Sequence, residues 1–170
     1  MGRTLRAGLD GLYRLCGLIA ALFLVAMLCI ILAQIGARWM GVQFPGSTSY
    51  AGYCMAGASF FALAYTLNHG AHIRVSLVIG QLAGASRRVA EFWCLGIATG
   101  LAWYFAWYAI KAVRVSRLIH DISQGQDATP LWIPQTFMAI GTVVLAIAFT
   151  DLLIRVLRGG ELPGDETVQE

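Results

Sequence analysis

The side chains of this sequence best suited to chemistry are three histidines and four cysteines. His69 and His72 lie three positions apart, and His120 stands alone farther along the chain. Histidine ligates haem iron in many cytochromes, and reactive cysteine pairs exchange electrons as thiols and disulfides. The cysteines are Cys16, Cys29, Cys54 and Cys94, and none of them belongs to a C-x-x-C motif. Whether either set forms a site depends on the elements that position it.

Charged residues are scarce in this chain and unevenly distributed. Hydrophobic residues make up 58% of it and charged residues 12%, whereas soluble domains carry roughly 25% charged residues. No Asp, Glu, Lys or Arg occurs in residues 15–37, 39–68, 92–110 or 128–150. Each window is long enough to cross a hydrocarbon core of about 30 Å as a helix, and none alternates as a β-barrel strand does. The sequence therefore predicts an all-α integral membrane protein with four transmembrane helices.

The predicted four-helix membrane domain covers residues 1–158, with spans at about 12–37, 49–68, 91–112 and 131–151. Between the second and third spans, residues 69–90 carry an apolar stripe with arginines elsewhere. This pattern predicts an amphipathic helix lying in the membrane interface, and the glycines of the segment leave an irregular loop as the alternative. The polar, acidic residues 159–170 are expected to form a disordered cytoplasmic tail.

The basic residues that flank the spans predict the orientation of the chain. Four crossings place both termini on one side, and the segments on that side hold eight of the 12 basic residues. The other side holds Arg38, Lys111, Arg114 and Arg117, of which Arg117 has the spacing to pair with Asp121. Both termini are therefore predicted to be cytoplasmic.

This topology argues against a haem held between the two sets of histidines. His69 and His72 fall at the cytoplasmic end of the second span, whereas His120 falls beyond the outer end of the third. The two sets are then separated by about the membrane thickness. Separate ligation, ligation across an oligomer, and simple capping of helix ends remain open for these histidines. The cysteines fit the role of small, buried apolar residues.

No further motif points to catalysis. Nucleophile–base pairs, phosphate-binding glycine loops and nucleic-acid motifs do not occur in the sequence, so neither an enzyme nor a metal, cofactor or nucleic-acid partner is predicted. The spans also lack an ionisable residue at their centres, although transporters usually build ion and proton sites from such groups. The chain alone is therefore not expected to be a complete transporter.

Small residues in the second and third spans predict close helix packing. Gly52 and Gly57 belong to a run rich in Ala, Gly, Ser and Cys, and Gly96-x-x-x-Gly100 places two glycines on one helix face. Such faces allow helix backbones to approach each other in a bilayer. The packed helix is either another part of this chain or a partner subunit, and the sequence leaves both open.

Several short motifs give the chain a family resemblance. They are Gln34-Ile-Gly-Ala-Arg-Trp39, Phe44-Pro-Gly46, Tyr50-Ala-Gly-Tyr53, Asn68-His-Gly-Ala-His-Ile-Arg-Val75, Thr129-Pro130 and Ile133-Pro-Gln135. With the size and the four predicted helices, they resemble the small membrane subunit of tripartite ATP-independent periplasmic (TRAP) transporters, the DctQ type. The likeness covers roughly residues 10–158. The chain departs from it at Thr48, Ser49 and Ser76, where the family often has acidic residues.

The resemblance implies a small permease subunit in the bacterial inner membrane. Its expected partners are a large polytopic transport subunit, which it would brace in the lipid bilayer, and a periplasmic solute-binding protein. Together they would carry out sodium-coupled symport of an organic acid. The resemblance also implies site residues: Gly70, His72, Ile73 and Val75 would anchor the interfacial helix, and Lys111, Arg114 and Arg117 are candidates for docking the binding protein. The alternative function is the membrane anchor of a redox complex of the cytochrome b type.

Overall fold

The computed structural model describes residues 3–68 and 85–157, and these residues form four α-helices. They are α1 (Arg3–Trp39), α2 (Ser47–Asn68), α4 (Ala85–Leu118) and α5 (Trp132–Leu157). Apart from one isolated bridge between Ile122 and Pro130, no β-pairing occurs in the described part of the chain. The predicted all-helical class is confirmed.

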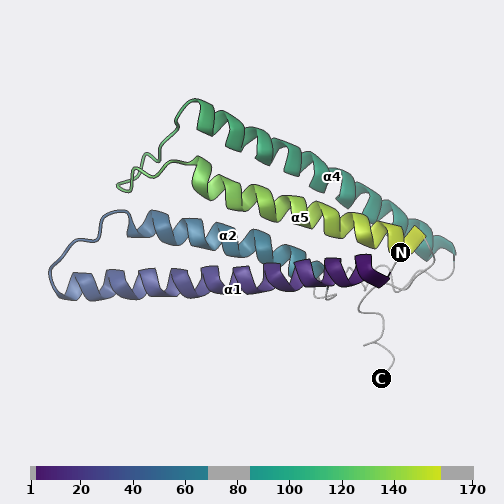
Figure 1. Cartoon of the computed structure of the whole chain (residues 1–170), viewed down its shortest axis with the longest axis horizontal. Coiled ribbons are helices and arrows are strands. Elements are labelled where there is room, and N and C mark those ends of the chain that lie inside the picture. Colours follow the sequence, from purple (N-terminus) through teal and green to yellow (C-terminus); the bar gives the residue numbers. More distant parts are fainter. Residues whose placement is uncertain (1–2, 69–84, 158–170) are drawn as a thin grey trace, which may run out of the picture.

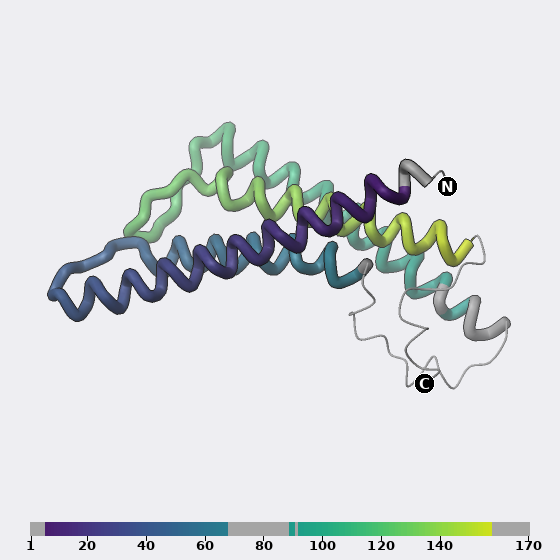
Figure 2. Tube along the Cα trace, turned by 60° about the horizontal axis from the view of Figure 1, so that its bottom comes forward, coloured from purple at the N-terminus to yellow at the C-terminus, as the bar shows by residue number. Residues whose placement is uncertain are grey.

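The helices pair as two antiparallel hairpins that lie side by side. α1 packs along α2, α4 packs along α5, and the hairpins meet where α2 contacts α5. The resulting order, α1–α2–α5–α4, is visible in Figure 1, and Figure 2 shows the same elongated arrangement from another side. The outer helices α1 and α4 each pack chiefly on one neighbour, so each has a face that the described residues leave uncovered.

The buried core lies where α1, α2 and α5 come together. Its members recur at three- or four-residue spacing on each helix, which places them on one face. They are Tyr13, Cys16 and Ala20 of α1, Phe61, Ala64 and Leu67 of α2, and Val144, Ala148 and Leu152 of α5. Many of these side chains are small. In a bilayer the hydrophobic effect does not drive helices together, so they associate through close packing, which small residues allow.

Glycines bring α2 close to both of its neighbours. A Cβ at Gly141 of α5 would lie 2.7 Å from the Cβ of Phe60, and one at Gly57 of α2 would lie 3.1 Å from the ring of Phe23 in α1. The ring of Tyr65 similarly occupies the space beside Gly17. Larger side chains at these positions would force the helices apart. The predicted small-residue face at Gly57 is thus used within the chain.

Three of the helices are long and apolar enough to cross a membrane. These spans are Arg6–Trp39, Phe92–Leu118 and Trp132–Leu157. Large apolar side chains such as Leu22, which is 60% exposed, cover their outward surfaces, as expected for a surface that faces lipid rather than water. The fourth helix, α2, does not reach the same apolarity, because Ser, Thr, Tyr, Gly and Asn interrupt it.

Two predicted segments fall wholly or largely outside the described residues. The interfacial helix was predicted over 69–90, of which only the last residues are described, and these already belong to α4 because that helix begins at Ala85. Of the predicted tail, 159–170, no residue is described. At its other end α4 continues to Leu118, so the helix itself is longer than the membrane span predicted to end near residue 112.

Candidate functional site

Two connections form one end of the molecule, which we call the loop end. They are residues 40–46, between α1 and α2, and residues 119–131, between α4 and α5. In Figure 1 both lie at the same end of the bundle, opposite the start of α1 and the end of α5. Most of the candidate site residues that the structure describes lie at this end or on α4.

Residues 40–46 turn sharply because of two glycines. Gly41 ends α1 with a left-handed backbone (φ 71°), and the N–H of Val42 donates to the carbonyl of Ala37 at 2.9 Å. This is a common way to satisfy the last carbonyls of a helix. Gly46 is also left-handed (φ 76°) and buried, immediately before α2. A Cβ at Gly46 would lie 2.7 Å from the Cβ of Asp127, so the two connections touch there.

Residues 119–131 form a compact hairpin-like loop. The N–H of Ser123 donates to the carbonyl of Thr129 at 2.8 Å, and the N–H of Leu131 donates to the carbonyl of Asp121 at 3.0 Å. His120 and Ala128 have positive φ angles of 54° and 45°, which side chains other than glycine rarely adopt. His120 thus serves as a turn residue at the loop end.

Asp127 joins this loop to α2 through hydrogen bonds to its carboxylate. The Tyr53 hydroxyl donates to Oδ2 at 2.8 Å, and the Ser123 hydroxyl donates to Oδ1 at 2.9 Å. Desolvation acts to raise the pKa of Asp127, but the hydrogen bonds from Thr129, Tyr53 and Ser123 outweigh it and hold that pKa well below its ordinary value. The charged carboxylate therefore links the two helical hairpins.

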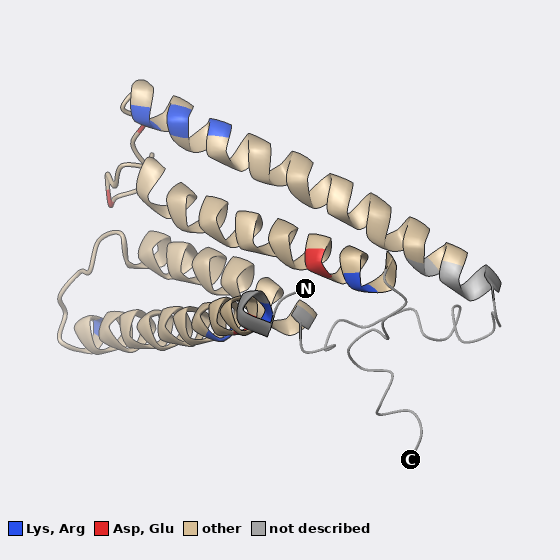
Figure 3. Ribbon diagram, turned by 45° about the vertical axis from the view of Figure 1, so that its right-hand side comes forward, with Lys and Arg blue, Asp and Glu red and all other residues tan. Residues whose placement is uncertain are grey.

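The three basic residues predicted for docking are exposed at the end of α4. Lys111, Arg114 and Arg117 form the basic bands on that helix next to the loop end in Figure 3. The Lys111 ammonium lies 5.9 Å from the centre of the Tyr108 ring, and the Arg117 guanidinium lies 5.6 Å from that of Trp132. The expected pair between Arg117 and Asp121 is not among the ion pairs of the described residues. The spacing allows this ion pair, but in the structure the guanidinium lies over an aromatic ring instead.

The glycines predicted for packing have different surroundings. Gly57 contacts Phe23, as described above, whereas a Cβ at Gly52, Gly96 or Gly100 would meet no atom of residues 3–68 and 85–157 within 4 Å. On α4 the two open glycines share one uncovered side with large aromatic residues at three- or four-residue spacing. We call this the outer face of α4, formed by Trp93, Gly96, Gly100, Tyr104 and Trp107. Gly70, His72, Ile73 and Val75 lie outside the described residues, as does His69.

The remaining candidates for chemistry stay apart in the described part of the chain. Within residues 3–68 and 85–157, no three His, Cys, Asp or Glu side chains come close enough to hold a metal ion. The four cysteines are free thiols: Cys16 is buried, Cys54 is partly buried, and Cys29 and Cys94 are exposed.

Sequence reasoning missed two polar contacts. One is the Asp127–Tyr53 hydrogen bond, which joins residues too distant in the chain for any local pattern to reveal. The other is the ion pair between Asp151 and Arg155 on α5, which lies near the opposite end from the loops (Figure 3). Asp151 is only 4% exposed, and the neighbouring Tyr13 is fully buried with no partner for its hydroxyl among the described residues. The i, i+4 spacing of Asp151 and Arg155 was the available signal.

Comparison with known proteins matches the chain to a protein family. A family model described as "Tripartite ATP-independent periplasmic transporters, DctQ component" matches residues 27–159, which include α2, α4, α5 and the last third of α1. A search among curated proteins found no significant match.

Proposed function

Because the chain belongs to the DctQ family, the small components of TRAP transporters, we propose that it is the small permease subunit of such a transporter. In this role it braces the large transport subunit in the bacterial inner membrane and helps to dock a periplasmic solute-binding protein. The complex takes up an organic acid by sodium-coupled symport. The observation that carries the proposal is the family match over most of the chain.

The outer face of α4 supports the bracing role. It offers two glycines with open space above them between large aromatic side chains, of which Trp107 is 70% exposed. Glycines one turn apart allow a second helix to approach closely, and aromatic residues beside them supply contact area. We propose that a helix of the large subunit packs on this face.

The antiparallel hairpins support four membrane crossings. α2 has 22 residues, which at about 1.5 Å per residue is roughly 33 Å, enough to cross the hydrocarbon core. It lies between α1 and α5, both of which are apolar enough to span, so protein covers two of its sides, while Thr48 and Ser59 stay exposed. In this topology the loop end faces the periplasm and both termini face the cytoplasm.

The exposed basic residues of the loop end support the docking role. Lys111, Arg114 and Arg117 present three positive charges close together, and such a cluster steers an acidic partner surface toward it.

The experiment that tests the function is affinity purification of the tagged chain from its native host in mild detergent. A large polytopic membrane protein is expected in near-equal amount, without visible absorbance from a chromophore. A solitary chain, or a coloured redox partner, would overturn the proposal and favour the redox-anchor alternative.

The docking role has its own test. Replacement of Lys111, Arg114 and Arg117 by Glu is expected to lower binding-protein-dependent uptake by about tenfold, because reversed charges repel an acidic partner. The matched control is charge reversal at Arg6 and Arg14 of α1, at the other end of the molecule. Unchanged uptake in the triple variant, with normal assembly of the two membrane subunits, would disprove a docking role for these residues.

A further inference from the structure

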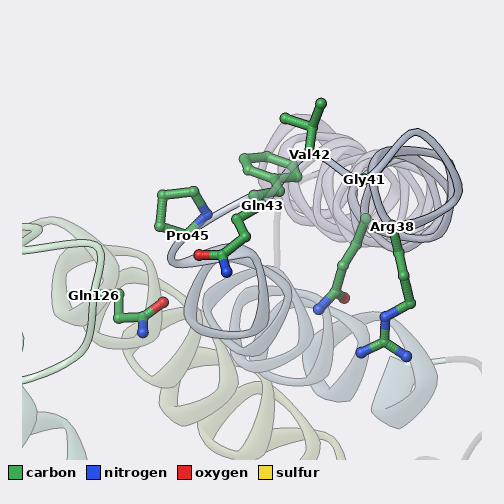
Figure 4. A pocket seen from close by; sticks show the side chains of 8 residues that line it. Arg38, Gly41, Val42, Gln43, Pro45 and Gln126 are labelled. Atoms are coloured by element: carbon green, nitrogen blue, oxygen red, sulfur yellow. The ribbon is translucent and has the colours of Figure 1, made fainter.

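An open cleft lies at the loop end beside the Asp127 contact. It has a volume of about 410 Å³ and is bordered by the end of α1, residues 40–46 and the tip of residues 119–131. This volume falls within the roughly 300–1,000 Å³ of typical small-molecule sites. In Figure 4 the Gln43 and Gln126 amides border the same opening, with the Arg38 guanidinium on its other side. The docking and bracing roles leave this cleft unused.

The polar side chains of the cleft suit an anion with several oxygen atoms. Arg38 is the only charged residue in its lining, and the amides of Gln34, Gln43 and Gln126 add further N–H donors. In the described part of the chain no ion pair neutralises Arg38. A guanidinium presents a planar fork of donors that matches a phosphate group.

The acidic residue that adjoins the lining in the chain does not compete for this charge. Asp127 follows Gln126 in the chain, but it does not line the cleft. Its two carboxylate oxygens accept hydrogen bonds from Tyr53 and Ser123 instead. The cleft therefore combines one unpaired cation with neutral donors.

The position of the cleft favours a lipid as the source of the phosphate. The α1 span ends at Trp39, next to Arg38, and Trp39 is 87% exposed. Tryptophan is enriched at the level of the lipid headgroups, so the cleft opens where lipid phosphates lie. Its remaining wall is apolar, formed by Val42, Phe44 and Pro45, and suits the glycerol and upper acyl region of a lipid better than a free ion.

We propose that this cleft binds the phosphate of a phospholipid headgroup, with the Arg38 guanidinium and the glutamine amides as its donors. The bound lipid would fill the gap between the α1–α2 connection and the α4–α5 loop. It would thereby add a second link between the two hairpins, beside Asp127.

The test is native mass spectrometry of the purified full-length chain, in mild detergent, with the host phospholipids it retains. The wild type is expected to keep one phospholipid, and Arg38→Gln is expected to lower the lipid-bound fraction by about tenfold, because it removes the charge–phosphate contact. Arg114→Gln is the matched control, since it removes the same charge from the same end without touching the cleft. Arg38→Lys keeps the positive charge but loses the planar guanidinium, so it is expected to retain part of the lipid binding. This variant also controls for misfolding of Arg38→Gln.

Further experiments distinguish between the possible ligands of the cleft. Delipidated chain is mixed with vesicles of phosphatidylethanolamine and phosphatidylglycerol, with and without an excess of inorganic phosphate. Rebinding of lipid despite the phosphate supports the proposal, whereas displacement of the lipid by inorganic phosphate would assign the cleft to a free anion. Equal lipid retention by the wild type and Arg38→Gln would refute the proposal that the cleft binds a phospholipid. So would a selective loss of binding-protein docking in Arg38→Gln with its lipid retained, which would make the cleft a protein contact.

Discussion

Gly46 and Asp127 show how single residues connect the two hairpins at the loop end. Gly46 has a left-handed backbone, and a Cβ there would overlap Asp127, so only glycine fits both the turn and the contact. Asp127 then reaches Tyr53 on α2. Phe44-Pro-Gly46 is one of the motifs that carry the family resemblance. The turn and the contact with Asp127 explain why its last residue is glycine.

At this scale we predict that the link depends on the charge of Asp127. Its pKa is lowered in the folded protein, so its contribution to stability is present above the unfolded pKa of about 4 and is lost as the pH falls below that value. Thermal unfolding of the wild type in detergent should therefore show a fall in Tm as the pH drops below about 4. Asp127→Asn should have a lower Tm at neutral pH and a weaker dependence on acid.

The matched control for this prediction is Asp121→Asn, which removes a carboxylate from the same loop but leaves the bonds to Tyr53 and Ser123 in place. It should retain the acid dependence of the wild type. Identical pH profiles for Asp127→Asn and the wild type would show that the carboxylate does not link the hairpins.

At the scale of elements, α2 and α4 differ in how they use small residues. α2 is covered by α1 on one side and α5 on another, so Gly57 serves packing within the chain. α4 packs chiefly on α5, and Gly96 and Gly100 face outward. The same residue type therefore serves an internal contact in one helix and leaves a free surface in the other.

We predict that filling this free surface prevents assembly. Gly96→Leu with Gly100→Leu should lower the amount of large subunit that co-purifies by about tenfold, equivalent to roughly 1.4 kcal/mol, because the partner helix can no longer approach. The fold of the chain itself should be unaffected, since neither site has a neighbour within 4 Å.

Gly36→Leu is the matched control, because Gly36 also has open space around it but lies on α1. It should leave co-purification unchanged. Equal recovery of the large subunit with the α4 double variant would place the subunit contact on another face.

At the scale of the whole molecule, the proposed topology is argued from the side-by-side hairpins. α2 lies between two helices that are apolar enough to span, and its own composition is less apolar because its sides face protein. Hydropathy alone therefore underestimates the tendency of a helix to span the membrane when other helices shield it from lipid. The proposed fourth crossing rests on this arrangement.

Alkaline phosphatase fusions test this topology, because the reporter is active only outside the cytoplasm. Fusions after Gln43 and Gln126 should be active, whereas fusions after Asn68 and after Leu157 should be inactive. Activity after Asn68 would mean that α2 does not cross the membrane. Activity after Leu157 together with inactivity after Gln126 would invert the proposed orientation.

The sequence by itself determined the helical class, the approximate positions of the four helices and the family, because charge-free apolar windows and short local motifs are properties of neighbouring residues. Only the tertiary structure decided which glycines pack inside the chain and which face outward, since this depends on how the hairpins lie against each other. It also decided that Asp127 reaches Tyr53 and that Arg117 stacks on Trp132 rather than pairing with Asp121. Likewise the cleft around Arg38 forms only when two connections distant in the chain meet. Contacts between such distant segments leave no periodic trace in a single sequence.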